Sequence, residues 1–376
     1  MKVGITGQNG FIGNHLYNWM SLDDSIELVN FDKGFFENDA LMDTFVKECD
    51  VIVHLAAMNR HQNEQVIYDT NMALTSQLIA SCKRSNANPH IIFSSSTQEA
   101  QDNLYGKSKK ESKRLLEKWA LNSEGQFTSL TIPNVFGPFG KPNYNSFIAT
   151  FCYKLTHNET PEIHVDSEVR LIYVNELIEI ITGIVKDHIS TDKINTGCYQ
   201  YVVNPTSTKR VSEILDLLVS YKENYIGKGM FPSLEDSFEK ALFNTFRCYI
   251  PHDHYPVHLV KHSDPRGSFV EITRANTSGQ FSFSTTVPDV TRGNHYHTRK
   301  AERFAVINGK ALIQLRRIGT NEIIEYHLDG DQPAYVDMPI WYTHNIKNVG
   351  ETELVTLFWI NEPYDPEDAD TYFENV

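Results

Sequence analysis

The segments around residues 96 and 105 carry side chains suited to reduction chemistry. Tyr105 and Lys109 are four residues apart at the start of a predicted helix, so they lie one turn apart on the same face. A lysine cation beside a phenol favours the phenolate, which makes the tyrosine a usable proton donor and acceptor. Ser96 ends an apolar strand, where parallel sheets place their ligands. A solvated helix face is the simpler reading of YxxxK alone, but the three features together predict a catalytic site.

A glycine-rich turn follows the first predicted strand and opens a helix. Its spacing is GxxGxxG, and such a turn lets the free N–H groups of a helix N-terminus bind a pyrophosphate. A plain surface turn is the alternative reading, but the position directly after a buried strand favours a dinucleotide. The residues predicted to bind it are Gly7, Gly10, Phe11, Ile12 and Gly13.

Asp32 and Lys33 follow the second predicted strand and bear on the choice of cofactor. An acid at this place usually accepts from the ribose 2′-hydroxyl, which favours NAD. Lys33 can instead neutralise a 2′-phosphate. Because the expected chemistry is reductive, we predict NADPH.

A second set of residues, in the last third of the chain, has the types and spacing of a metal site. His295 and His297 are two residues apart on a predicted strand, so both side chains face the same way. Glu302 follows closely and His344 lies further along the chain. An isolated HxH is most often incidental. The full set predicts three histidines and one carboxylate around a divalent metal, with zinc as the expected ion.

Size and composition limit the classes of function. The chain has 376 residues, 40% of them hydrophobic, which is enough for two cores. A formal charge of −14 argues against nucleic acid or an anionic membrane as partner. Five widely spaced cysteines without a CxxC pair are expected to be reduced thiols. With neither a secretory leader nor a long apolar run evident, we expect a cytoplasmic protein.

The elements that must position these residues change in character along the chain. Residues 1 to about 135 alternate β-branched strands with amphipathic helices, which predicts a doubly wound parallel sheet. From about residue 255, short strands separated by Asn-Gly, Asp-Gly and Pro turns predict an antiparallel sandwich or barrel. We therefore expect an α/β domain over 1–250 and an all-β domain over 251–376. The strands expected in the first part are 2–6, 26–31, 51–55, 91–94 and 128–132.

The N-terminal motifs resemble the extended short-chain dehydrogenase/reductases over at least residues 1–185. The resemblance implies a Rossmann-type fold with Ser96, Tyr105 and Lys109 as the catalytic triad. Residues 50–57 resemble a strand motif whose backbone lies along the cofactor, and Asn71 stands at a structural asparagine of the family. The cofactor and substrate contacts that the resemblance adds are Leu55, Ala56, Ala57 and Pro133 for the cofactor, and Asn134 and Arg170 for the substrate.

Some positions depart from the family pattern. Thr131 stands where many relatives have Arg. Thr97 and Gln98 stand where sugar 4,6-dehydratases carry an acid pair, and a shift of one residue makes Thr97–Glu99 a damaged form of that signature. A dehydratase or epimerase fused to a 3,5-epimerase therefore remains an alternative. A non-catalytic NADP- or sugar-binding protein is another, although it would not need an intact Ser/Tyr/Lys set.

Residues 290–350 resemble both motifs of the cupins, with Trp341 where the second motif usually has Gly. The resemblance implies that His295, His297, Glu302 and His344 bind a metal.

A second resemblance covers the start of the same region. Residues 264–271 resemble the opening motif of nucleotide-4-keto-sugar 3,5-epimerases, which implies that Arg266 and Glu271 hold the nucleotide. The run from Arg292 to His295 resembles the Arg-Gly-x-His of that group, whose histidine is the proton-abstracting base. His295 is also the first cupin ligand, so its two roles compete. Solvated loops are the plainer reading of the two arginines.

The whole chain resembles the bifunctional enzymes of capsule and O-antigen synthesis that join a reductase to a cupin. Residues 141–146, 149–154 and 342–346 share in that resemblance, which adds Asn145 as a substrate contact and a homodimer. It implies that the cupin epimerises carbon 3 of a UDP-2-acetamido-2,6-dideoxy-4-hexulose. The reductase would then reduce the 4-keto group with NADPH to UDP-N-acetyl-6-deoxy-L-talosamine, on the route to UDP-N-acetyl-L-fucosamine.

Overall fold

The computed structural model of the chain describes residues 1–187, 189–195 and 197–376. They form two compact units: unit 1 has residues 1–136, 140–147 and 167–210, and unit 2 has residues 137–139, 148–166 and 211–376. Packing therefore groups residues 211–250 with the later part of the chain, whereas the predicted boundary groups them with the earlier part. As a division of functions, the boundary near residue 250 stays a prediction.

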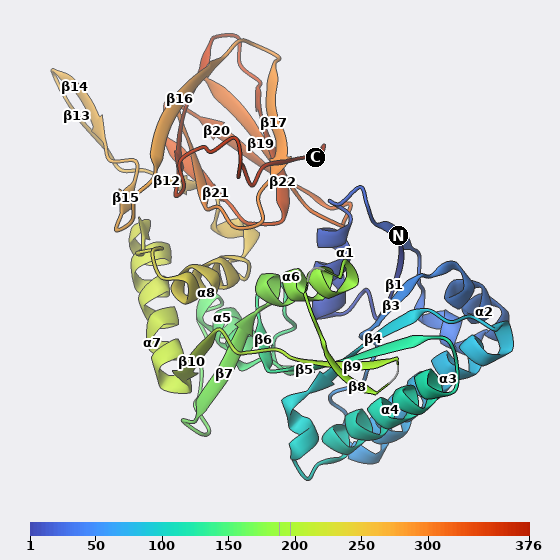
Figure 1. Cartoon of the computed structure of the whole chain (residues 1–376). Coiled ribbons are helices and arrows are strands. Elements are labelled where there is room, and N and C mark those ends of the chain that lie inside the picture. The colour runs from blue at the N-terminus through green and yellow to red at the C-terminus, as the bar shows by residue number, and fades with distance from the viewer. Residues whose placement is uncertain (188, 196) are drawn as a thin grey trace. The chain divides into compact units, whose positions relative to one another are not determined.

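Seven of the described strands form the main sheet of unit 1, in the order β2-β1-β3-β4-β5-β9-β8 (Figure 1). All are parallel to their neighbours except β8 at the edge. The predicted doubly wound, Rossmann-like sheet is confirmed. Because β2 and β3 lie on opposite sides of β1, the order reverses at β1, and such sheets bind ligands at the carboxyl ends of the strands there. The strands are β1 (Lys2–Thr6), β2 (Glu27–Val29), β3 (Val51–His54), β4 (His90–Ser96), β5 (Gln126–Ile132), β8 (Asp192–Asn195) and β9 (Cys198–Val202).

Helices cover both faces of this sheet. Val51 and Val53 of β3 pack in one buried cluster with α1 and α6, and Ile52 packs in the other with α2, α3 and α4, as the alternation of a strand requires. Of the described helices, none is both long and apolar enough to cross a membrane. The helices of unit 1 are α1 (Phe11–Met20), α2 (Asp39–Glu48), α3 (Glu64–Ser85), α4 (Leu104–Leu121) and α6 (Val174–Val185), with short helices η1 (Lys33–Glu37) and η2 (Thr97–Ala100).

A small sheet follows the main one in unit 1. It has the order β10-β7-β6, with β6 parallel and β10 antiparallel to β7. Its strands are β6 (Asn134–Phe136), β7 (Glu168–Tyr173) and β10 (Ser207–Arg210).

Two antiparallel sheets dominate unit 2, in the orders β12-β21-β18-β23-β16 and β20-β19-β22-β17-β24. They share one buried apolar cluster, to which Phe304 and Val336 contribute from the first sheet and Ile313 and Ile346 from the second. The predicted antiparallel architecture of this region is confirmed. The strands are β12 (Val257–His258), β16 (Gln280–Thr286), β17 (Thr291–Tyr296), β18 (Glu302–Asn308), β19 (Lys310–Arg317), β20 (Ile323–Asp329), β21 (Ala334–Met338), β22 (Tyr342–Asn348), β23 (Leu354–Ile360) and β24 (Tyr372–Phe373).

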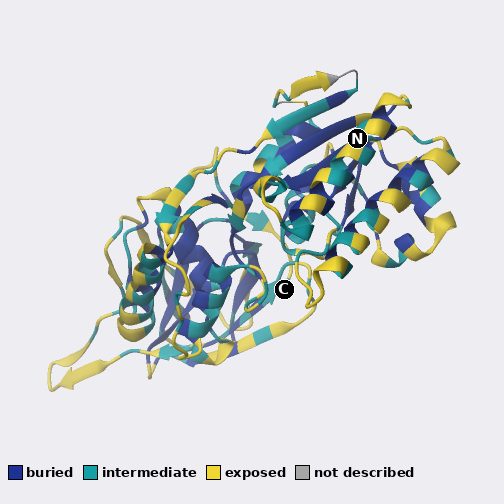
Figure 2. Ribbon diagram, turned by 90° about the horizontal axis from the view of Figure 1, so that it is seen from below, coloured by how far each residue is buried: buried dark blue, intermediate teal, exposed yellow. Residues whose placement is uncertain are grey.

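Unit 2 also contains helices and an exposed hairpin. The hairpin, β13 (Lys261–Asp264) and β14 (Gly267–Val270), extends from the sheets as an arm that is exposed along almost its whole length (Figure 2). A short pair of strands, β11 (Met230–Phe231) and β15 (Arg274–Ala275), lies near its base. The helices are α5 (Phe147–Thr156), α7 (Val211–Tyr221), the π-helix η3 (Lys222–Ile226), α8 (Ser237–Arg247) and η4 (His252–His254).

Candidate functional sites

The carboxyl ends of β1 and β3 meet at the switch point of the sheet. Gly7 has φ +76°, and a Cβ there would lie 2.8 Å from the backbone nitrogen of Ala56, so only glycine fits. Thr6 ties the two ends together: its hydroxyl lies 2.7 Å from Nδ1 of His54 and accepts a hydrogen bond from Ala56 N at 3.3 Å. Gly10 is the N-cap of α1 and, being glycine, has no side chain to cap the first N–H groups of the helix. They are available to an anion.

The other predicted cofactor residues lie around this turn. Gly13 sits where a Cβ would be 2.2 Å from the carbonyl oxygen of Gly7, so α1 packs directly on the turn. Phe11 and Ile12 are half-buried in its first turn, and Leu55 and Ala57 flank Ala56 after β3. The Asp32 carboxylate accepts from Gly34 N at 2.7 Å and begins η1, while Lys33 is exposed beside it. The residues of both competing cofactor predictions are therefore present at one strand end.

The predicted tyrosine and lysine lie on the first two turns of α4. The helix begins at Leu104, where the Asn103 side chain accepts from Gly106 N at 2.7 Å, so Tyr105 lies at its start as predicted. Lys109 is buried, and its Nζ donates to the carbonyl of Ser94 at 2.8 Å. The same nitrogen lies 5.8 Å from the centre of the Tyr105 ring. The lysine thus holds α4 against the carboxyl end of β4.

Ser96 is the last residue of β4, on the same sheet edge. Its hydroxyl accepts from Gln98 N at 3.2 Å, and its backbone is in register with Ile132, the residue before Pro133. The serine, the start of α4 and the end of β5 therefore share one edge of the sheet.

Burial sets the protonation of the two titratable groups. It lowers the pKa of Lys109 to about 8, and it raises the pKa of Tyr105 to about 12. Burial therefore opposes formation of the phenolate, and the effect of Lys109 on Tyr105 stays a prediction. Tyr105 is a protonated phenol at neutral pH, which is the form that can donate a proton.

Asn71 has the structural role expected of it. It is buried in α3, and its amide bonds to both backbone groups of Met58, at 2.7 and 2.9 Å, and to the Ser108 hydroxyl at 2.9 Å. The asparagine fixes the loop after β3 to α3 and α4. Glu99, from the degraded dehydratase signature, has its carboxylate bonded by the Ser95 hydroxyl.

Two of the three predicted substrate contacts in unit 1 are neighbours. Asn134 of β6 donates to the carbonyl of Arg170 in β7 at 3.4 Å, and both side chains are exposed. Asn145 lies apart in sequence, exposed in the loop before α5.

In unit 2 the four predicted metal ligands converge. Their ligand atoms all lie within 4.8 Å of one another, although the residues come from β17, the loop after it, β18 and β22. Oε2 of Glu302 lies 3.3 Å from Nε2 of His297 and 3.2 Å from Nε2 of His344. A β-bulge between Gly293 and His295 brings His295 into register with His344 on the neighbouring strand.

These residues fit a divalent metal. Nδ1 of His297 lies 2.5 Å from the carbonyl of Asp370, and Nδ1 of His344 lies 3.1 Å from the carbonyl of Tyr342, which leaves Nε2 of each ring facing the cluster. The separation of about 3.3 Å to Glu302 is close to that of two ligands about 2.0–2.1 Å from one tetrahedral ion. Imidazole and carboxylate ligands suit a divalent transition metal.

The cluster contains one carboxylate and one weakly basic imidazole. Burial alone would raise the pKa of Glu302, but hydrogen bonds from His297 and His344 hold it well below its usual range. Burial lowers the pKa of His295 to about 4, with His344 adding to the effect. His295 is therefore a neutral imidazole at physiological pH, and it is the most exposed of the three.

The predicted nucleotide contacts of unit 2 are bonded to groups other than the four cluster residues. Arg266 is exposed at the turn of the arm and pairs with Asp264 at 2.6 Å, and Glu271 pairs with Arg274 at 2.6 Å. Arg292 lies on β17 and bonds to Thr286 and Thr285 at 3.1 and 3.2 Å.

Comparison with known proteins shows two matching families and relatives of known name. Residues 3–197 match the NAD dependent epimerase/dehydratase family, and residues 262–372 match the polysaccharide biosynthesis C-terminal domain. A Pseudomonas aeruginosa protein named UDP-2-acetamido-2,6-beta-L-arabino-hexul-4-ose reductase is 31% identical over 380 residues, 99% of this chain and 98% of its own. The Bacillus subtilis spore coat polysaccharide biosynthesis protein SpsL is 29% identical over 122 residues, 30% of this chain and 81% of its own.

A crystal structure matches over the whole length. The capsular polysaccharide assembling protein CapF of Staphylococcus aureus is 35% identical with a TM-score of 0.62, and each chain is covered completely. Fold and site together define an NAD(P)-dependent reductase of the short-chain type with an appended antiparallel β unit. The chain belongs to the NAD dependent epimerase/dehydratase family, as a CapF-type enzyme of capsular polysaccharide synthesis. The predicted membership is confirmed.

Proposed function

We propose that the chain converts a UDP-activated 4-keto amino sugar in two steps. The β unit, a cupin, epimerises carbon 3 of a UDP-2-acetamido-2,6-dideoxy-4-hexulose. The reductase then reduces the 4-keto group to give UDP-N-acetyl-6-deoxy-L-talosamine, on the route to UDP-N-acetyl-L-fucosamine. The proposal rests on the presence of two candidate sites in one chain. Tyr105 and Lys109 lie at the carboxyl ends of the parallel strands, and four possible metal ligands converge in the β unit. The printed name of the Pseudomonas relative, a hexul-4-ose reductase, supports the substrate class.

The reductase step needs a proton at the 4-oxygen when carbon 4 is reduced. Tyr105 is protonated and half-buried in the first turn of α4, so it is the proposed donor. The Ser96 hydroxyl would hold the keto oxygen, and the Lys109 cation would stabilise the phenolate that the donation leaves. NADPH, bound over the Gly7 turn, would supply the hydride.

We propose NADPH over NADH. Lys33 is exposed next to Asp32, at the end of the strand where the adenosine ribose of such cofactors lies. Asp32 already accepts a backbone bond from Gly34, which leaves the lysine to meet a 2′-phosphate.

The epimerase step needs a base that takes the proton from carbon 3 and a group that stabilises the enolate. His295 is the proposed base, because its ring is the least enclosed of the three imidazoles and it ends the Arg-Gly-x-His run. A zinc ion held by the cluster would supply charge for the enolate oxygen. If His297, Glu302 and His344 suffice as ligands, His295 is free to act.

The exposed arm supports a homodimer. Edge strand β16 presents Phe281 and Phe283 to solvent at 61% and 69% exposure, and Phe269 on the arm is 67% exposed. A second copy would cover these apolar side chains. It would also be the means by which Arg266 and Glu271 reach a nucleotide at a cluster. We place the enzyme in the cytoplasm, where its five free cysteines stay reduced.

One incubation tests the proposal. The full-length protein is mixed with NADPH and a panel of UDP-4-keto amino sugars, with and without a chelator, and products are identified by NMR. We expect NADPH oxidation and a product inverted at carbon 3, with the inversion lost after chelation. NADPH oxidation without inversion at any pH would leave a reductase whose β unit has another role.

Separate variants resolve the two roles of His295. His295→Gln is expected to retain zinc and to lose inversion if His295 is the base. Loss of zinc from this variant would instead make His295 a ligand.

A further inference from the structure

The C-terminal segment, residues 361–376, contacts the elements that carry the cluster residues. Strand β24 pairs with β17, where Phe373 lies opposite His295. The carbonyl of Glu374 accepts from the Thr343 hydroxyl, next to His344 in β22. In Figure 1 the segment is the dark red chain that ends at the C label.

The same segment forms hydrogen bonds with the loop between His297 and Glu302, two of the proposed ligands. Residues 298–301 connect His297 to Glu302, and Ala301 exchanges two hydrogen bonds with Asn361, at 2.7 and 3.1 Å. Lys300 is buried, and its Nζ donates to the carbonyl of Ala369 at 2.7 Å. The position of Glu302 therefore depends on residues far away in sequence.

Asp370 makes the largest share of these contacts. It is 5% exposed, and its carboxylate accepts four hydrogen bonds: from the N–H and hydroxyl of Thr298 at 2.9 and 2.7 Å, and from the N–H groups of Arg299 and Lys300 at 3.0 and 3.1 Å. Its own carbonyl lies 2.5 Å from Nδ1 of His297. One residue thus fixes both the loop and the imidazole.

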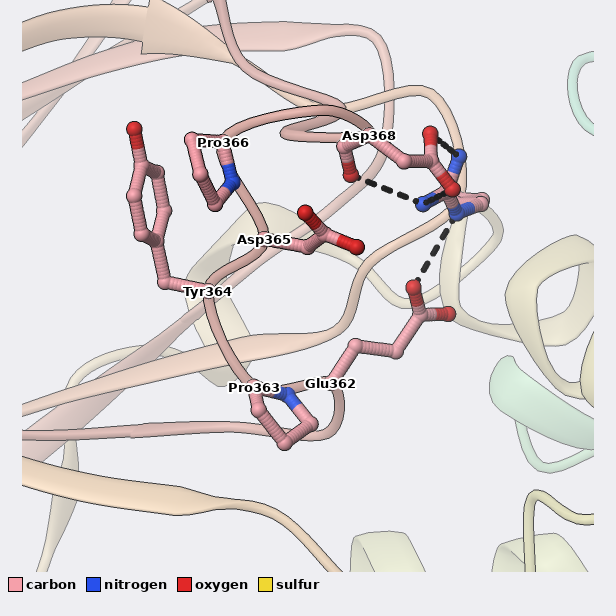
Figure 3. A pocket seen from close by; sticks show the side chains of 7 residues that line it. Glu362, Pro363, Tyr364, Asp365, Pro366 and Asp368 are labelled. Carbon is pink, nitrogen blue, oxygen red and sulfur yellow. Dashed lines mark hydrogen bonds and ion pairs between the residues drawn. The ribbon is translucent and has the colours of Figure 1, made fainter.

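The ion pairs outside this contact are more exposed. Arg299 bonds to Glu362 at 3.0 Å and to Asp368 at 2.7 Å (Figure 3), with a third of its side chain open to solvent. Exposed ion pairs of this kind add little to stability. The buried carboxylate of Asp370 is therefore the contact that sets the geometry.

We infer that Asp370 is a positioning residue of the metal centre. Its backbone carbonyl orients the His297 ring so that Nε2 faces the metal. Its carboxylate fixes the conformation of residues 298–300, which places Glu302 beside the same metal. The inference rests on the proposed metal site. Removing the partner of a metal-bound histidine typically weakens metal binding about 10–100-fold.

The test compares the zinc affinity of three full-length variants with that of the wild type, by competition with a chromophoric chelator. Asp370→Asn keeps the backbone carbonyl that contacts His297 but turns one acceptor oxygen of the side chain into a donor, so the loop should loosen and the Kd for zinc should rise by about tenfold, the low end of the range for partners outside the ligand set. Thr298→Val removes one of the four bonds, and its Kd should rise by a smaller factor. Asp365→Asn is the matched control, because Asp365 is exposed in the same segment and its carboxylate accepts from Glu367 N within its own turn.

The visible spectrum of the cobalt-loaded proteins separates positioning from general support. Positioning predicts a changed ligand-field spectrum in Asp370→Asn and an unchanged one in the control. A variant whose metal-free form melts earlier, yet which keeps the wild-type Kd and spectrum, would overturn the inference. Should Asp370→Asn fail to fold, a wild-type Kd in Thr298→Val has the same force. A wild-type chain that binds no zinc would overturn the metal site itself, and the positioning role with it.

Discussion

In unit 1 the candidate site is drawn from strand ends and one helix start, whereas in unit 2 it is drawn from strands that the chain reaches at widely separated points. The residues of the reductase site lie in short motifs whose spacing already fixes their geometry, such as Tyr105 and Lys109 on one helix face. The ligand cluster depends on tertiary features: a β-bulge between Gly293 and His295, and the contact of the Asp370 carbonyl with His297. The residues of both sites could be predicted from the sequence, but the distant contact of Asp370 with His297 could not.

The electrostatics of the two sites differ as well. Lys109 is a buried cation whose pKa burial lowers, and Glu99 opposes that shift only in part. In the cluster, Glu302 is a buried anion stabilised by two imidazoles. The reductase site is therefore sensitive to alkaline pH, and the cluster to loss of either imidazole that stabilises Glu302.

The largest expected effect is at Tyr105. Tyr105→Phe removes the only proton donor that we assign to the 4-oxygen, so NADPH oxidation should fall at least about 100-fold. NADPH binding, measured by calorimetry, should remain near the wild-type level because the ring is kept. Near-normal turnover would remove this residue from the mechanism.

Breaking a buried ion pair in unit 2 should lower the free energy of unfolding. Arg303 and Asp337 are each about 2% exposed and bond at 2.7 Å, and Tyr225 donates to the same carboxylate at 2.6 Å. Asp337→Ala leaves the cation unpaired and should cost about 3–5 kcal/mol in denaturant unfolding. Asp331→Ala, at an exposed position, is the control and should change stability by less than about 0.5 kcal/mol.

The same contact bears on where unit 2 can be cut. A fragment from residue 251 lacks Tyr225 and the Phe231 ring that lies 4.7 Å from the Arg303 guanidinium. We expect it to be much less stable than the β unit within the full chain. A fragment as stable as the full chain would support the predicted boundary at residue 250.

The reductase should lose activity in alkali. Lys109 has a folded-state pKa of about 8, below the value of about 10.4 for an unfolded lysine. Its charge is therefore present below pH 8 and lost above it, so kcat/KM for reduction should fall as pH rises through about 8. From pH 8 to about 10.4 the unfolded chain binds the extra proton, so this group makes the protein more stable as pH rises.

The pH profile has a matched control. Lys110 is exposed on the next position of α4, and Lys110→Met should leave the falling limb unchanged. A flat profile to pH 10 would contradict the assignment of that limb to Lys109.

The smallest expected effect concerns the cofactor. Lys33→Ala should weaken NADPH binding by about fivefold or less, the worth of one exposed ion pair, and should leave NADH binding unchanged. Titration can follow the fluorescence of Trp19 in α1. Equal weakening of both cofactors, or tighter NADH binding by the wild type, would show that Asp32 governs the choice.

The contrast between the two sites also limits what the sequence predicts. Strand–helix alternation predicted the parallel sheet, and the HxH pattern with Glu302 and His344 predicted residues that the structure brings within 4.8 Å. Asp370 had no such signal, since it is one carboxylate in an acidic C-terminal segment and acts through tertiary contact. The burial that raises the pKa of Tyr105 had no sequence signal either, because burial is a property of the fold.

The two-chemistry account is tested most directly by hydrogen exchange at carbon 3 of the keto-sugar in heavy water. Wild type and Tyr105→Phe, without NADPH, are incubated with a UDP-2-acetamido-2,6-dideoxy-4-hexulose, and deuterium at carbon 3 is followed by NMR. We predict that both exchange at similar rates, and that a variant with His295 and His344 replaced does not exchange, yet still reduces a sugar already epimerised. Absence of exchange in a zinc-loaded wild-type protein would contradict the account and leave the cluster without a role in epimerisation.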